Sequence, residues 1–339
     1  MAKKTSADNA AEILRDLKNR IYHPVYFLCG EEPFYIDKIA DFVEANVLNE
    51  MEKEFNFSIL YGQDIKIPEL VASCKRYPMM SEYQVIIVKE AQNIDKIEEL
   101  KPYVENPVKS TILVLCYKYK TIDRRKEFGK IIDKKSVYFN SEKVADYKLA
   151  QWIEQYVKEE KLKIGPRQSA LLAEFLGNDL SKIANEIEKL KIFVPDGAEI
   201  TDDIIQKNIG ISKDYNVFEL QNALGEKDIL KSNRIITYFA QNEKSHPVFT
   251  LIPSLYGYYT KIMRYHLVST KPAREIAAEL GVHEFFVRDY ARYAKNYSPG
   301  KCVKIFEYLL EADLKSKGVD TTGMEGGDIM KELVYKILH

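Results

Sequence analysis

Gly30 follows an apolar run, residues 25–29, and precedes Glu31, Glu32 and Pro33 at the start of a helical pattern. Strand, tight turn and helix form the setting in which a P-loop cradles nucleotide phosphates. That chemistry needs several glycines, a lysine for the phosphates and a serine or threonine for magnesium. Here two carboxylates would repel a triphosphate, and the proline has no N–H group. The turn predicts a nucleotide-binding architecture without its nucleotide, or else an ordinary α/β turn.

A second feature of nucleotide hydrolases is an apolar strand that ends in an acidic pair, which holds magnesium and orients water. The matching strand here is residues 85–88, and it is followed by Lys89 and Glu90. Lys89 places a cation where the metal-holding carboxylate belongs, and a cation repels magnesium. Two independent parts of an ATPase site are therefore altered, which favours an ATPase-like fold without ATPase activity.

No other pattern predicts catalysis. The histidines are widely scattered, and no HExxH, GxSxG or Cys/His nucleophile pattern is present. The cysteines form no CxxC pair, so a zinc ribbon is not expected. Three of them lie in apolar surroundings, which is typical of buried thiols in a reducing compartment; the four are Cys29, Cys74, Cys116 and Cys302. We therefore expect no catalytic residues, no metal site and no cofactor.

Met79 and Met80 follow Tyr77 and Pro78 and precede Ser81, in a turn between a predicted helix and a predicted buried strand. Methionine is flexible and polarisable, so it fills irregular core gaps and also suits adaptable binding surfaces. Composition alone favours the first role, in which both side chains fill the core of their own domain. The alternative is an apolar plug that enters the pocket of a partner.

Residues 273–293 have the spacing of a helix-turn-helix, with Gly281 at the turn. A helix that reads DNA presents Arg, Lys, Asn or Gln at its start. This one offers Glu284, Phe285 and Phe286, of which the glutamate would face phosphates badly. A structural helical hairpin is favoured, and a DNA-binding protein that uses this segment is the alternative.

The length and composition of the chain indicate its class and the number of its domains. A chain of 339 residues with 46% apolar and 30% charged residues predicts a globular protein of two or three domains. Its formal net charge of −1 does not match a general nucleic-acid binder. We find no signal peptide and no stretch that could span a bilayer, so no membrane partner and a cytoplasmic location are expected.

Strand patterns alternate with helical patterns up to about residue 142, which predicts a three-layer α/β domain at 1–142. The β-branched runs 84–88 and 111–116 fit strands buried on both faces of a parallel sheet. Strand signals then stop. Three short helical stripes predict an all-α module at 143–211, and residues 212–339 are also helical throughout. Within 212–339, a helix near its middle has more apolar residues than a single core needs: Phe249, Leu255, Tyr256, Tyr258 and Tyr259.

Five segments in order along almost the whole chain resemble the delta subunits of bacterial DNA polymerase III. They are 26–34 (YFLCGEEPF), 79–88 (MMSEYQVIIV), 176–190 (LGNDL through NEIEKL), 280–287 (LGVHEFFV) and 309–315 (LLEADLK). The resemblance implies a degenerate P-loop-type, ATPase-like α/β domain at 1–142, a three-helix lid at 143–211 and a helical collar for oligomerisation at 212–339.

The resemblance also implies a function. Such a subunit sits in a five-subunit clamp loader with gamma/tau and delta-prime subunits, and it reaches primer–template DNA through that complex. It binds the ring-shaped sliding clamp and holds one interface open, while gamma/tau hydrolyse ATP. The family's clamp-binding element corresponds to Met79 and Met80, framed by Tyr77, Pro78 and Ser81. Family members often present Leu and Phe there, so the methionine pair differs in residue type but is likewise apolar. An accessory protein of this fold with another partner is the remaining alternative.

Overall fold

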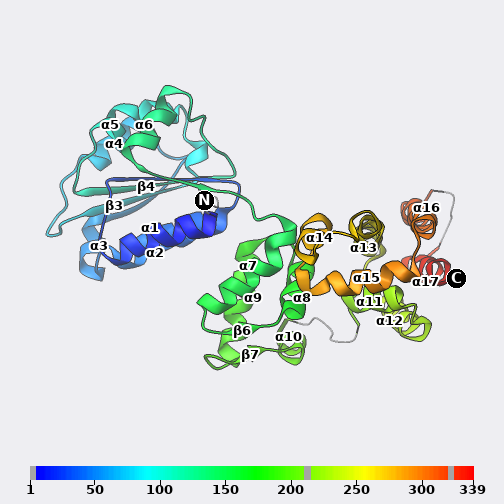
Figure 1. The fold of residues 1–339 in the computed structure, drawn as a ribbon. Coiled ribbons are helices and arrows are strands. Elements are labelled where there is room, and N and C mark those ends of the chain that lie inside the picture. The colour runs from blue at the N-terminus through cyan, green and yellow to red at the C-terminus, as the bar shows by residue number, and fades with distance from the viewer. Residues whose placement is uncertain (1–4, 210–214, 320–323) are drawn as a thin grey trace. The chain divides into compact units, whose positions relative to one another are not determined.

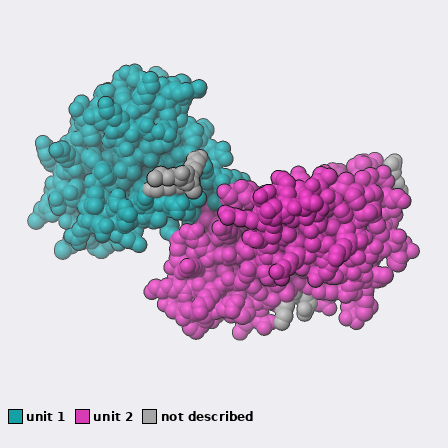
Figure 2. Space-filling view, viewed as in Figure 1, with its two compact units in different colours: residues 1–144 teal, residues 145–339 magenta. Residues whose placement is uncertain are grey.

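The computed structural model describes residues 5–209, 215–319 and 324–339. The chain forms two compact units, residues 1–144 and 145–339, which Figure 2 distinguishes by colour. The division of the second unit into a lid at 143–211 and a collar from 212 stays a prediction, because residues 211 and 212 lie outside the described ranges. In the part of the chain that the structure describes, none of the helices has the length and apolar composition of a membrane span.

A parallel five-stranded sheet forms the centre of unit 1, in the order β2-β3-β4-β1-β5. The strands are β1 (Val25–Gly30), β2 (Phe57–Tyr61), β3 (Gln84–Lys89), β4 (Thr111–Lys118) and β5 (Val137–Ser141). The three inner strands, β3, β4 and β1, are buried along nearly their whole length. This confirms the prediction that continuous apolar runs form strands covered on both faces.

Helices cover the sheet on both sides (Figure 1). One layer holds α1 (Ser6–Lys18) and α2 (Pro33–Asn46). The other holds α4 (Ile67–Cys74), α5 (Lys101–Glu105) and α6 (Glu127–Lys135). Buried residues of all three helices of this second layer join the strands in one hydrophobic cluster. The predicted three-layer α/β arrangement is therefore present.

The apolar/polar alternation and the aromatic residues of 55–61 predict a strand that begins at residue 55. The structure differs in the first two residues. Phe55 and Asn56 instead end a short helix, α3 (Glu50–Asn56). A capping box explains the difference: the Asn49 side chain accepts from the Glu52 N–H, and the Glu52 carboxylate accepts from the Asn49 N–H. Two bonds at its start therefore stabilise a helix that the aromatic pattern alone did not indicate.

Unit 2 begins with the predicted helices α7 (Asp146–Glu159), α8 (Pro166–Leu176) and α9 (Leu180–Phe193). It also contains a parallel two-stranded ladder, β6 (Lys163–Ile164) with β7 (Glu199–Ile200), and the helix α10 (Asp202–Ile209). The prediction that strands end near residue 142 was wrong for this ladder. Strands of two residues are too short to show any alternation of apolar and polar residues.

The rest of unit 2 is a helical bundle. Its helices are α11 (Val217–Glu226), α12 (Ile229–Gln241), α13 (Val248–Val268), α14 (Ala273–Leu280), α15 (Val287–Asn296), α16 (Pro299–Ser316) and α17 (Gly326–Leu338). Leu255, Tyr258 and Tyr259 of α13 are buried in the core of this bundle. These three are core residues, so only part of the apolar set of this helix exceeds the needs of the core. Phe249 and Tyr256 remain exposed.

Candidate functional site

A nucleotide would be expected at the carboxyl edge of the parallel sheet, after β1. Three backbone N–H groups of that turn are already bonded within the protein. The Gly30 N–H donates to the Lys120 carbonyl at 3.0 Å, and the Glu32 N–H donates to the Ser141 carbonyl at 3.2 Å. The Phe34 N–H at the start of α2 donates to the Glu32 carboxylate at 3.1 Å. A carboxylate of the protein thus occupies the helix N-terminus that a phosphate would need.

Close packing against β5, rather than phosphate binding, explains why residue 30 is glycine. Its φ is +128°, and a Cβ atom at this position would lie 2.2 Å from the backbone oxygen of Ser141. Because only glycine permits so close an approach of β5, this residue serves sheet packing rather than phosphate binding.

The magnesium position is also altered. Lys89, predicted at this position, is the last residue of β3, and Lys118 lies at the carboxyl end of the adjacent parallel strand β4. Lys118 forms an ion pair with Asp37 of α2 at 2.6 Å. Burial, and then the neighbouring Asp37 charge, raise the pKa of the Asp41 carboxyl on the same helix. In the parts of the chain that the structure describes, no group of three or more His, Cys, Asp or Glu side chains could hold a metal ion. At the carboxyl edge, Lys118 and Asp37 are therefore paired with each other.

The methionine pair lies at the opposite, amino edge of the sheet, in the segment between α4 and β3. We call residues 75–83 the methionine loop. Met79 is 60% exposed and Met80 is 101% exposed, while Tyr77 beside them is 86% exposed. Pro78 and Ser81 are half-buried. The structure thus excludes the interpretation that both methionines fill the core of their own domain.

Side chains from neighbouring elements hold the loop. The Gln84 amide, buried at the start of β3, donates to the Arg76 carbonyl at 2.7 Å and to Thr111 Oγ1 at 2.6 Å. The Asn56 side chain, at the end of α3, accepts from the Met79 N–H at 2.7 Å and donates to the Met79 carbonyl at 2.8 Å. The loop is therefore fixed both at its base and beside its exposed methionines.

Met80 has a left-handed backbone, with φ of +52°. A residue with a Cβ atom loses roughly 1–2 kcal/mol in this conformation relative to the right-handed one. The side chain recovers none of that energy by packing, because it is fully exposed. An apolar side chain held in a costly conformation and presented to solvent is typical of a functional contact rather than of a folding requirement.

The helix-turn-helix segment belongs to the core of unit 2. Phe286 packs against Phe218 with ring centroids 5.4 Å apart, and Val287 is buried beside it, while Phe285 stays exposed. Arg292 on the second helix is paired with Glu226 at 2.5 Å. These contacts favour the predicted structural hairpin over a DNA-reading helix.

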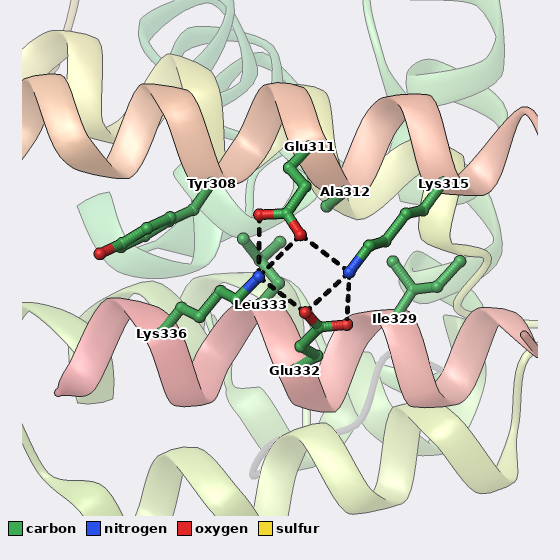
Figure 3. Close-up of a pocket in the computed structure, with 8 residues that line it drawn as sticks. All are labelled: Tyr308, Glu311, Ala312, Lys315, Ile329, Glu332, Leu333 and Lys336. Carbon is green, nitrogen blue, oxygen red and sulfur yellow. Dashed lines mark hydrogen bonds and ion pairs between the residues drawn. The ribbon is translucent and has the colours of Figure 1, made fainter. Parts of the chain in front are cut away.

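Two further features of the chain lack the chemistry of a site. All four cysteines are buried, and burial raises the pKa of Cys74 and Cys116 to about 12, so their thiols stay protonated and unreactive at neutral pH. A small pocket between α16 and α17 is lined in part by four charged side chains that bond to one another: Glu311, Lys315, Glu332 and Lys336 (Figure 3). This balanced network is a contact between two helices.

Comparison with known proteins agrees with the resemblance. A family model for the DNA polymerase III delta subunit matches residues 26–142, and one for the C-terminal domain of that subunit matches residues 214–325. The DNA polymerase III subunit delta of Bacillus subtilis is 26% identical over 333 residues, which are 95% of this chain and 94% of that protein. The solved structure of the Bacillus subtilis DNA clamp loader delta protein has the same fold, with a TM-score of 0.56 and 23% identity over 97% of this chain and 99% of that one. The two matched ranges and the full-length relative lead to one conclusion: the chain belongs to the DNA polymerase III delta-subunit family.

Proposed function

We propose that this chain is the clamp-loader subunit that binds the sliding clamp through the methionine loop and opens its ring for loading onto primed DNA. The observation that carries the proposal is the full exposure of Met80 beside an exposed Met79, on a loop that the fold holds in place. We place this activity in the cytoplasm, where chromosomal DNA is replicated.

Met79 and Met80 are the contact residues in this proposal, and Tyr77, Pro78 and Ser81 frame them. The two thioether side chains enter an apolar pocket on the clamp. Burial of each methionine contributes roughly 1.5–3 kcal/mol, and their conformational freedom lets them fit a pocket that accepts other apolar residues. The framing residues limit the access of water to this contact.

Ring opening follows from differential affinity. A protein that binds the open form of a ring more tightly than the closed form shifts the equilibrium toward the open form. No nucleotide chemistry in this chain is needed for that shift. The bonded N–H groups of the turn after β1 and the Lys118–Asp37 pair support this division of labour, in which gamma/tau subunits hydrolyse the ATP.

The helical bundle of unit 2 would provide the surface for the gamma/tau and delta-prime subunits, and through them the access to primer–template DNA. Large apolar side chains exposed on α13 and α16 support this aspect of the proposal: Phe249, Tyr256, Val303 and Leu310. A monomer has no need to expose so many large side chains on two helices that contact each other.

The test is binding of the full chain to the sliding clamp of its own organism. The double substitution Met79→Asp, Met80→Asp would place two carboxylates in an apolar pocket, so we expect affinity to fall by at least about 100-fold. The matched control is Leu267→Asp, which changes an exposed apolar residue (82%) of unit 2 and should leave affinity unchanged.

Circular dichroism and thermal unfolding show whether each variant is folded. Equal binding by a folded double variant and the wild type would reject the methionine loop as the docking site. Absence of binding by the wild-type chain would instead indicate an accessory protein of this fold with another partner.

A further inference from the structure

Asn56 is a buried polar residue whose side chain bonds the backbone of a distant, exposed segment. It is 5% exposed, and it lies 23 positions before Met79 in the sequence. The sheet topology explains the contact: β2 and β3 are adjacent and parallel, so the residues that enter these two strands meet at the amino edge. Asn56 is the last residue of α3 before β2, and the methionine loop leads into β3.

The side-chain amide of Asn56 is fully used. Its oxygen accepts from the Met79 N–H at 2.7 Å, and its nitrogen donates to the Met79 carbonyl at 2.8 Å and to the Glu52 carbonyl at 3.0 Å. Only a carboxamide supplies one acceptor and two donors at this reach. The pair of bonds to Met79 fixes one residue from both of its peptide groups, immediately before the left-handed Met80.

We propose that Asn56 is a positioning residue for clamp binding, which holds the methionine loop in its docking conformation before the partner arrives. This inference rests on the proposed function. A flexible loop loses conformational entropy when it docks, and a loop that is already ordered avoids most of that loss. Asn56 thus contributes to affinity through Met79 and Met80, without a contact of its own to the clamp.

The first test is hydrogen exchange of the Met79 amide in the full-length chain without clamp. We expect protection in the wild type and its loss in Asn56→Ala, which removes the acceptor. Asn56→Asp keeps an acceptor for this N–H but places a carboxylate against the Met79 carbonyl, so we expect partial protection. Asn46→Ala is the matched control, because Asn46 also bonds the carbonyl four residues earlier in its helix, at 2.9 Å, but lies on α2.

The second test is clamp affinity of the same variants. We expect Asn56→Ala to bind about tenfold more weakly, Asn56→Asp to bind several-fold more weakly, and Asn46→Ala to bind as the wild type does. In a Met80→Ala background the effect of Asn56→Ala should shrink well below tenfold, because the positioned side chain is gone. A general loss of fold would instead weaken binding equally in both backgrounds. If Asn56→Ala does not fold, the effect of Asn56→Asp on clamp affinity is compared in the wild-type and Met80→Ala backgrounds instead.

Unchanged clamp affinity in a variant whose Met79 amide has become unprotected would overturn the inference. So would an equal effect of Asn56→Ala in the wild-type and Met80→Ala backgrounds. These outcomes are distinct from failure of the proposed function, in which the double aspartate variant at positions 79 and 80 still binds the clamp.

Discussion

Met80 combines three properties that a folding requirement does not explain. Its side chain is apolar, it is fully exposed, and its backbone is left-handed. Sequence could locate the residue but not these properties, since composition favoured a place in the core. Asn56 and Gln84 bond the backbone of the methionine loop at Met79 and Arg76, from outside the loop. A sequence pattern does not reveal such long-range hydrogen bonds.

Met80→Gly should raise stability and lower clamp affinity. Glycine adopts the left-handed conformation without a Cβ penalty, so we expect unfolding to cost about 1 kcal/mol more. The melting temperature should rise by a few degrees, while loss of the side chain weakens clamp binding by about 30-fold or more.

Tyr119→Gly is the matched control for this substitution. Tyr119 is also exposed and left-handed, with φ of +61°, but it lies after β4 at the carboxyl edge of the sheet. We expect the same gain in melting temperature with unchanged clamp affinity. A lower melting temperature for Met80→Gly would mean that this side chain packs against the protein in solution.

Elements differ in how clearly the sequence indicates them. The inner strands β1, β3 and β4 were predictable, because burial on both faces requires continuous apolar runs. Helix α3 was not, because its start depends on two side-chain bonds and its aromatic residue is exposed. Because α3 was not predicted, the sequence did not indicate that Asn56 at its end bonds the methionine loop. The loss of nucleotide binding after β1 stays a prediction from residue types, because Pro33 and the two glutamates disfavour phosphate binding.

The four charged residues between α16 and α17 connect these helices through alternating ion pairs (Figure 3). Lys315 contacts Glu332 at 2.7 Å and Glu311 at 2.8 Å. Hydrogen bonds from Lys315, and then from Lys336, lower the pKa of both carboxyl groups below the ordinary value of 4.5. Their contribution to stability is therefore present above about pH 4.5 and is lost as pH falls through the lower pKa of the folded state.

Lys315→Met keeps most of the apolar stem and removes the charge. We expect a loss of about 0.5–1 kcal/mol at neutral pH, because the group is partly exposed to solvent, and a smaller loss at high salt or below about pH 4. Lys317→Met is the control, since Lys317, the C-cap residue of α16, pairs with Asp313 of that same helix at 2.6 Å and is 65% exposed. An equal effect of the two substitutions in thermal unfolding would show that the network adds nothing beyond separate surface pairs.

At the scale of the whole molecule, each of the two units has its own hydrophobic core. Unit 1 carries the methionine loop at the amino edge of its sheet and the turn after β1 at the carboxyl edge. A hydrophobic cluster of unit 1 is built from residues within 25–132, and a cluster of unit 2 from residues within 220–338. Each unit therefore has the apolar core that an independently folding domain needs.

Residues 1–144 should fold alone and bind the clamp as the full chain does. The N-terminal helix α1 belongs to this unit, because the Ser6 hydroxyl accepts from the Glu142 N–H at 2.8 Å and so joins the two ends of the fragment. Asn56 and Gln84, which bond the methionine loop, lie within the fragment, as does Thr111, which bonds Gln84. We therefore expect a cooperative thermal transition and a clamp affinity within about threefold of that of the full chain.

A folded fragment that binds much more weakly would show that unit 2 contributes to the docking surface, because the loop and its supporting residues are unchanged. A fragment that binds with full affinity would assign clamp contact to unit 1 and leave unit 2 for the other subunits of the loader.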